Sequence, residues 1–289
     1  MNISPSGVYN YDEQYLFSNR DLYLRLVILD ANTKMIIAND LVNSDDFNKE
    51  YVRNFLNNSL KDLPLKGMVT DGANYYPEII DDLGVPHQIC VFHKMQNLMD
   101  LHYKIINKNK LKIKRKEEKI EKLENQIKDI KTKQGTVSQG RIPKNNHKRI
   151  KTHEKIKNKQ KEIKILNSEI KDCKKENKIL KDDEKKISRI FKSKTIKTAK
   201  KRFNEFKENI DNLLEPTKLF IKRLEKTFER TTKHIVHKFL PNTNNIIECY
   251  FGVTLPKLGK RKYRTIEGLK RRLKLSDIRW IEKNVLKIG

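Results

Sequence analysis

Short apolar runs alternate with polar turns over the first hundred residues, a spacing typical of β-strands. Three such runs predict strands at residues 7–17, 22–29 and 35–42. The first run alternates strictly, so Asn10, Asp12 and Gln14 share one face of the strand and Glu13 points to the other. The polar turn between the second and third runs brings them back antiparallel. The pattern therefore predicts a three-stranded meander.

The chain then changes to helices that alternate with strands. Apolar side chains at helical spacing predict a helix over residues 47–63, with Ser44, Asp45 and Asp46 offering the N-cap. The next runs predict a strand at 65–70, a helix at 75–83 and a strand at 85–92. The resulting order is βββαβαβ, and few folds begin with a meander and then alternate in this way. We expect an α/β core.

From Tyr103 onward the apolar period becomes seven residues, which indicates coiled-coil helices. The first seam consists of Ile113, Ile120, Leu123, Ile127 and Ile130. The second consists of Ile156, Ile163, Leu166, Ile170, Cys173, Leu180 and Ile187. A loop with Gly and Pro joins the seams, so we expect an antiparallel hairpin about 45 Å long. Lys116 and Lys159 fall at core positions, which predicts a weak coil.

Helical spacing continues through residues 191–235, with a fresh helix starting at Pro216. After a break at 241–243, a helix over 244–251 presents Glu248 among apolar neighbours. Further helices are expected from Thr265 and from Ser276. We therefore expect three parts: an α/β core over residues 1–103, a helical coiled-coil insertion over residues 104–235, and a completion of the core over residues 236–289.

Charge is divided unevenly among these parts. The chain carries 64 Lys+Arg against 37 Asp+Glu, a net charge of +27. Residues 1–103 hold 8 basic and 14 acidic side chains, net −6, whereas residues 104–202 hold 36 and 13, net +23. Residues 203–289 hold 20 and 10, net +10. This balance indicates a polyanionic partner, and the basic arm either contacts DNA directly or mainly packs and oligomerises.

Composition also bounds the compartment. Three cysteines in 289 residues predict no disulfide framework and a reducing environment. No run approaches the roughly 20 apolar residues of a membrane span. We expect a soluble cytoplasmic protein with no membrane partner and no small-molecule cofactor.

Two acids stand out as candidates for chemistry. Asp71 follows an apolar strand at a tight Asp-Gly turn, where a carboxylate can reach a metal or a phosphate, although such turns are also common for structural reasons. Glu248 is costly in an apolar surround unless it has a partner, and a metal ion is one candidate. The basic loop that follows suits phosphate contacts through Lys257, Lys260, Arg261, Lys262 and Arg264.

Two motifs resemble those of one family. The stretch TDGANYYPEIIDDLGVPHQICVFHKMQNL, with the C-x-x-H element Cys90 to His93, resembles the region of the second acid in Mutator-type and related insertion-sequence transposases. TNNIIECYFG followed by KRKYRTIEGLK resembles their third-acid region. These are DDE transposases of the RNase H-like superfamily. The resemblance covers residues 7–103 and 236–275, with a helical insertion between them.

The resemblance implies an RNase H-like core whose catalytic, metal-binding carboxylates are Asp12, Asp71 and Glu248. Asp30 is the rival first acid, although its hairpin turn already accounts for it. Such a triad binds two Mg²⁺ ions, with Mn²⁺ as the alternative, for DNA strand cleavage and transfer at the ends of an insertion element. Cys90, His93 and Asn245 are supporting candidates.

We expect no structural zinc, because the chain offers no second C-x-x-C or C-x-x-H pair to complete four ligands. The resemblance further implies a homo-oligomer, associated with the nucleoid in a prokaryote. Relatives usually carry an N-terminal DNA-binding domain, so we expect a truncated or decayed copy. An inactive DNA-binding or coiled-coil protein derived from a transposase, and a nuclease of the same fold, are the alternatives.

We predict that DNA binding weakens steeply as salt is raised, because phosphate contacts by Lys and Arg release condensed counterions. Deleting residues 104–202 should flatten the dependence of log affinity on log salt. Fluorescence anisotropy with a short duplex measures this slope. An unchanged slope would show that the arm makes no phosphate contacts.

Overall fold

The computed structural model describes residues 4–135, 147–260 and 262–288. Arg261, which the sequence analysis predicts to contact phosphate, lies outside these residues. The chain forms two compact units. Unit 1 comprises Met1–Asn97, Ile187–Leu213 and Lys218–Gly289, and unit 2 comprises Leu98–Lys186 and Leu214–Thr217. Residues 187–213 and 218–235, which the sequence suggested as part of the insertion, therefore group with the sheet.

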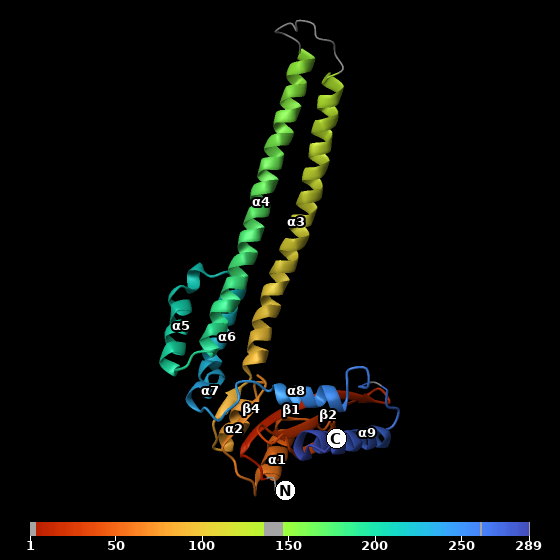
Figure 1. Ribbon diagram of the computed structural model, residues 1–289, viewed down its shortest axis with the longest axis vertical. Helices are drawn as coiled ribbons and strands as arrows, with labels where there is room; N and C mark the ends of the chain where they lie inside the picture. The colour runs from red at the N-terminus through yellow and green to blue at the C-terminus, as the bar shows by residue number, and fades with distance from the viewer. Residues whose placement is uncertain (1–3, 136–146, 261, 289) are drawn as a thin grey trace. The chain divides into compact units, whose positions relative to one another are not determined.

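A five-stranded sheet organises unit 1 (Figure 1). Its strands are β1 (Val8–Ser18), β2 (Asp21–Asp30), β3 (Ile36–Asn43), β4 (Gly67–Thr70) and β5 (His87–Ile89). They lie in the order β3-β2-β1-β4-β5. The first three form the expected antiparallel meander, and β4 and β5 add in parallel beside β1. The element order βββαβαβ is confirmed, and the class is mixed α/β.

Helices cover both faces of the sheet. On one face, α1 (Lys49–Leu60) and α2 (Tyr76–Asp82) pack through a core that includes Tyr9 and Tyr11. On the other, α8 (Asn245–Thr254) and α9 (Ile266–Ile281) pack through Tyr250 and Trp280 onto β2. Asn10 and Gln14 make their hydrogen bonds on this second face, to Asn244 and the backbone of α8. Strict alternation in β1 therefore separates an apolar face from a polar one.

Three expected boundaries are wrong. The last strand stops at Ile89, and α3 (Val91–Gly135) begins so early that His93 lies in a helix. The N-cap of α1 is Asn48, whose side chain accepts the Tyr51 N–H. No break occurs at Ser276, because its hydroxyl donates to the Arg272 carbonyl inside a continuous α9. A short π-helix (Glu282–Leu286) follows.

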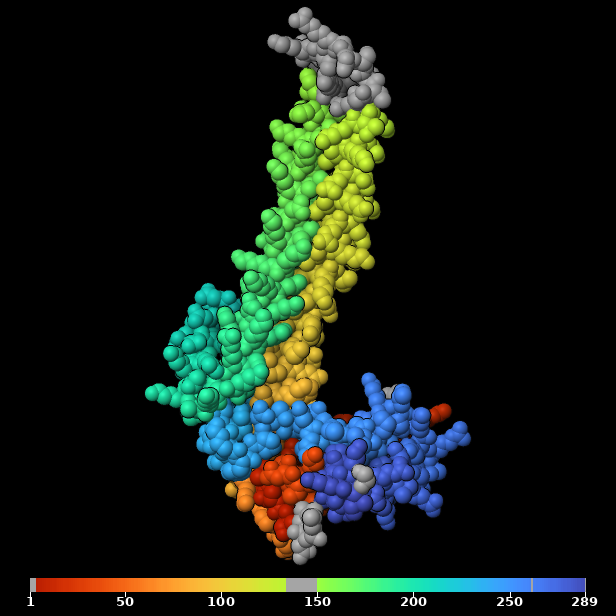
Figure 2. Space-filling model, in the orientation of Figure 1, coloured from red at the N-terminus to blue at the C-terminus, as the bar shows by residue number. Residues whose placement is uncertain are grey.

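Unit 2 consists mainly of two long antiparallel helices, α3 and α4 (His147–Phe191), whose side chains meet along the pair (Figure 2). The buried seam contains Leu123, Ile127, Ile156, Leu166, Ile170 and Leu180. Lys116 pairs with Glu169, and Lys159 donates to Gln126. The two core-position lysines thus reach polar partners on the opposite helix instead of remaining unpaired.

The remaining helices are α5 (Ile196–Glu208), a 3₁₀ turn (Ile210–Asn212), α6 (Glu215–Thr231) and α7 (Lys233–Val236). Residues 187–202 belong to unit 1, where Ile190, Phe191 and Ala199 are buried. A deletion that tests the helical hairpin and leaves unit 1 whole is therefore residues 113–172, with a short polar turn joining the shortened α3 and α4. It retains the hydrogen bond from Asn109 to Glu176 at 2.7 Å.

None of the described helices has the length and apolar character needed to cross a membrane.

A buried arginine fastens the second helical layer to the sheet. Arg25 on β2 is fully buried and donates to Asp277 on α9 at 2.6 Å and to Thr254 on α8 at 2.8 Å. It also donates to the Tyr250 hydroxyl. Because a buried guanidinium is stable only when its donors are satisfied, this network fixes where α8 and α9 sit.

Arg25→Met should destabilise the protein by about 3 kcal/mol, because it removes the buried cation paired with Asp277 and leaves that carboxylate only the hydrogen bonds from Tyr250 and Asn39. Chemical denaturation followed by circular dichroism measures the change. Arg53→Met is the matched control, because its three acidic partners on the surface are more than half exposed and such pairs contribute less than about 1 kcal/mol. Equal losses in the two variants would contradict the assigned role of Arg25.

Candidate functional site

Asp12 lies within β1, and Asp71 directly follows the neighbouring parallel strand β4. The register pairs Val8 with Gly67 and Asn10 with Val69, and the same offset carries Asp12 level with Asp71. Asp71 follows the last residue of β4, as expected, and its Oδ1 accepts the Ala73 N–H at 2.9 Å. The strand pairing therefore places the two carboxylates next to each other where β4 ends beside β1.

Their proximity has an electrostatic consequence. Burial, followed by repulsion from Asp71 and Glu13, raises the pKa of Asp12 to about 8. The Glu13 N–H, which donates to Asp12 Oδ1 at 2.9 Å, opposes this rise, and so does His93. An Asp12 carboxyl whose ionised form is disfavoured by burial and by a neighbouring acid belongs to a site suited to a cation.

Glu248 comes from the opposite helical layer. It lies in the first turn of α8, and its Oε1 is 3.3 Å from His93 Nε2. Interaction with the Cys90 thiol, Glu248 and Asp12 raises the pKa of His93 to about 9, although burial opposes the rise. His93 thus lies between Asp12 and Glu248 and connects the third expected acid to the first two.

Asn244 holds this arrangement together, and the sequence did not reveal it. Its Nδ2 donates to the Tyr11 carbonyl at 3.2 Å and to Asp12 Oδ2 at 3.3 Å, while its Oδ1 accepts from Asn10 at 2.6 Å. Its backbone N–H points to Cys90 Sγ at 3.2 Å. The expected supporting residue, Asn245, is instead exposed at the start of α8. Two adjacent asparagines gave no signal for choosing between them.

Lys94 is a second residue that the sequence analysis missed. It is partly buried in the first turn of α3, and a Cβ built on Gly72 would lie 3.5 Å from its Nζ. Burial lowers the pKa of Lys94, while the Asp71 charge raises it. Its side chain makes no ion pair within 4 Å among the described residues. The acid in the loop after β4 thus has a cation from α3 near it.

The rejected acids have other partners. Glu13 points to the opposite face of β1, where it accepts from Tyr11 at 2.7 Å and from the hydroxyls of Tyr75 and Tyr76. Asp30, the rival first acid, is fully buried and accepts the N–H groups of Asn32 and Thr33 in the hairpin turn. The turn accounts for Asp30.

The basic loop lies along the end of β1. Phe17 donates its N–H to the Lys260 carbonyl at 2.9 Å, and Tyr263 bridges to Ser18. Lys257, Lys262 and Arg264 are exposed, whereas Lys260 is partly buried. The three exposed cations are therefore accessible to a polyanion, and the contacts with β1 fix the loop that carries them.

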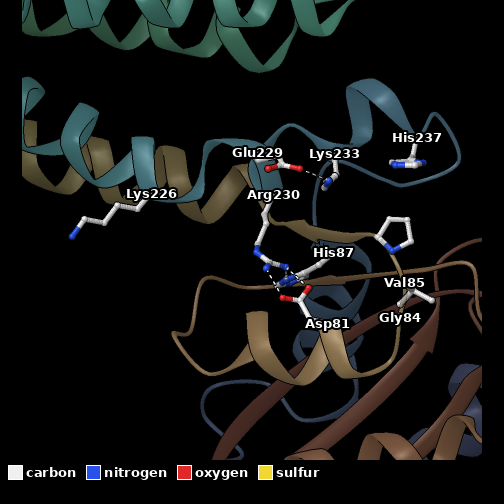
Figure 3. A pocket seen from close by; sticks show the side chains of 10 residues that line it. Asp81, Gly84, Val85, His87, Lys226, Glu229, Arg230, Lys233 and His237 are labelled. Carbon is white, nitrogen blue, oxygen red and sulfur yellow. Dashed lines mark hydrogen bonds and ion pairs between the residues drawn. The ribbon is translucent and has the colours of Figure 1, made fainter.

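A cavity of about 570 Å³ opens elsewhere in unit 1 (Figure 3). It is lined by Asp81, Gly84, Val85, Pro86, His87, Lys226, Glu229, Arg230, Lys233 and His237. Arg230 donates to both oxygens of Asp81, at 2.9 and 2.7 Å, and Lys233 pairs with Glu229 at 2.7 Å. Because its main cations are neutralised internally, this cavity offers little net charge to an anion.

The cavity nevertheless connects to the loop of Asp71. Burial, and then the Arg230 charge, lower the pKa of His87 to about 3, so its ring is neutral. His87 Nε2 lies 2.8 Å from Thr70 Oγ1, which donates to the Asp71 carbonyl at 2.9 Å. His87 thus supports the backbone at the end of β4.

Comparison with known proteins gives one significant finding. The chain is 22% identical over 281 residues to a protein of insertion element ISM1 from Methanobrevibacter smithii, described as an uncharacterized 48.3 kDa protein. The match covers 97% of the chain and 54% of that protein, so the chain spans about half the length of the curated relative it matches. No family model matches the chain.

Asp71→Asn should stabilise the metal-free protein and flatten its pH dependence. The folded protein keeps the Asp12 proton up to about pH 8, whereas the unfolded chain releases it near 3.8, so stability falls as pH rises between these values. The Asp71 charge is one cause of the raised Asp12 pKa, so removing it should reduce the loss of stability with rising pH. We expect Tm near pH 8 to rise by a few degrees, since about 1 kcal/mol corresponds to about 3 °C in a protein of this size.

Thermal unfolding in a chelating buffer across this range measures the effect. Asp62→Asn is the matched control, because Asp62 is exposed and has no ion pair among the described residues. If the control flattens the profile equally, repulsion at the paired strands is not the cause.

Proposed function

We propose that this protein is a transposition-related enzyme that cleaves and transfers DNA strands by metal-dependent phosphoryl transfer. The observation that carries this proposal is the parallel register that puts Asp12 level with Asp71. Neighbouring acids, one within β1 and one just after β4, are unfavourable for stability, which makes a purely structural role a poor explanation.

Two further observations support the proposal. A meander followed by two parallel strands, in the order β3-β2-β1-β4-β5, is what an RNase H-like core requires, and α8 supplies a third acid from outside the sheet. The relative from Methanobrevibacter smithii is a protein of an insertion element. The proposed class is a DDE transposase, with Asp12, Asp71 and Glu248 as its carboxylates.

The residues present fit a hard divalent cation. All three groups offer carboxylate oxygens, the ligands that Mg²⁺ and Mn²⁺ prefer. Glu248 Oε1 is buried and makes no hydrogen bond. Burial, and then the charges of Asp71 and Glu13, raise the pKa of Asp12, and a bound cation would oppose that rise. When bound, such ions activate a water or 3′-hydroxyl and stabilise the leaving oxygen.

The chain's own residues prepare the site. Asn244 and the Glu13 amide each donate to one oxygen of Asp12 and so orient its carboxylate. Lys94 supplies a positive charge beside Asp71, where a phosphodiester oxygen would otherwise meet only acids. In phosphoryl transfer the protein contributes mainly by positioning the reacting groups and stabilising charge.

DNA is the proposed partner. The exposed cations of the basic loop and the lysine-rich hairpin of unit 2 provide phosphate contacts that do not depend on sequence. Homo-oligomerisation through the hairpin, and a cytoplasmic, nucleoid-associated location, complete the proposal.

The purified protein should nick or join supercoiled DNA in the presence of Mg²⁺ or Mn²⁺. Asp71→Asn and Glu248→Gln should each lower the rate at least about a thousandfold, equivalent to roughly 4 kcal/mol, because each removes an oxygen ligand. Gel electrophoresis of nicked and joined products gives the rate.

The control is Asp62→Asn, which should retain full activity. Cleavage without strand joining would identify a nuclease. DNA binding with no metal-dependent cleavage in any variant would refute the enzymatic proposal and favour an inactive derivative.

A further inference from the structure

Three side chains of different chemistry meet beside the acid site. Cys90 immediately precedes α3, His93 lies in its first turn, and Glu248 lies in the first turn of α8. Their ligand atoms lie within 4.8 Å of one another. Cys90 and His93 share a face because they are three residues apart, and α8 brings Glu248 to that face from a distant part of the sequence.

Two of the three groups have a buried atom that makes no hydrogen bond. His93 Nδ1 is one, and Glu248 Oε1, which has an ion-pair contact with His93 Nε2 at 3.3 Å, is the other. A buried polar atom left unpaired costs about 1–3 kcal/mol, so two at one place require an explanation. A cation that takes a lone pair from the nitrogen and another from the oxygen satisfies both.

The sulfur is also prepared for a ligand. Cys90 is fully buried, and the Asn244 N–H points at its Sγ from 3.2 Å. An amide donor of this kind orients the sulfur as a metal ligand. Asn244 also holds Asp12, so one asparagine orients a ligand on each side of Glu248.

We propose that Cys90, His93 and Glu248 bind a divalent transition-metal ion, of which Zn²⁺ is the best match. Sulfur, nitrogen and oxygen donors select zinc-like ions over Mg²⁺. Three protein ligands leave one tetrahedral position open, unlike the four-ligand structural site that the sequence excludes. Glu248 has two oxygens, so it serves this ion and the proposed acid-site ion together. The inference rests on the proposed function only for that second role.

The competing explanation is a metal-free cluster, in which a protonated His93 pairs with Glu248 and hydrogen bonds to Cys90. Such a cluster has no special affinity for a transition metal. Metal binding therefore separates the two explanations.

Co²⁺ is the probe, because it replaces Zn²⁺ with the same ligands and a cobalt–thiolate bond gives a charge-transfer absorption in the near ultraviolet. Titration of the full chain should show one equivalent bound with this band. Zn²⁺ should abolish the band, and excess Mg²⁺ should not. Cys90→Ser should remove the band, and His93→Gln should weaken Co²⁺ affinity at least about tenfold.

Cys249→Ser is the matched control, because Cys249 is an exposed thiol next to Glu248 in the sequence and should keep the band. Circular dichroism verifies that each variant is folded, and His93→Gln keeps the test valid if Cys90→Ser unfolds. A band that survives in Cys90→Ser, a band lost in Cys249→Ser, or no stoichiometric Co²⁺ binding would overturn the proposal.

Asp71→Asn distinguishes this inference from the proposed function. It should abolish DNA cleavage while leaving the cobalt band intact, because Asp71 is not among the three ligands. Wild-type protein that binds Co²⁺ with the band but never cleaves DNA would support the metal site and refute the enzyme. Cleavage without the band would do the reverse.

Discussion

The carboxyl groups of Asp12 within β1 and of Asp71 just after β4 are unfavourable neighbours, and much of unit 1 is arranged so that they stay together. The register of β1 and β4 fixes Asp12 beside Asp71, and neither strand can slip without moving its apolar residues out of the core. Tyr9 and Tyr11, buried on the opposite face of β1, oppose such a slip. Packing energy on one face of the strand thus maintains an unfavourable charge pair on the other, as functional sites commonly require.

The third acid depends on a different constraint, the placement of α8. Asn244 at its start bonds to β1, and near its end Arg25 on β2 binds Tyr250 and Thr254. The helix is therefore attached to adjacent strands at two points, and Glu248 lies between them. Because both attachments are buried and polar, they define one position for the helix, which apolar contacts alone would specify less sharply.

The sequence predicted the elements well and the site in part. Alternation in β1 assigned Asp12 and Glu13 to opposite faces, because strand periodicity is local. The level pairing of Asp12 with Asp71 is a long-range register that no local pattern encodes. Lys94 is similar, since its proximity to Asp71 depends on α3 starting at Val91, inside the strand that was expected to run to residue 92. Residues that act through tertiary contacts leave little trace in periodicity.

Glu248 lies where two kinds of donor meet. On one side are the carboxylates of Asp12 and Asp71, which suit a hard cation, and on the other are Cys90 and His93, which suit a softer one. His93 is close enough to Asp12 to influence its pKa, so charge placed on either side changes the ionisation of the other. A cation at the sulfur and nitrogen donors would add positive charge near Asp12 and favour its carboxylate form. A metal ion at Cys90, His93 and Glu248 would therefore favour the binding of a second ion at the carboxylates of Asp12 and Asp71.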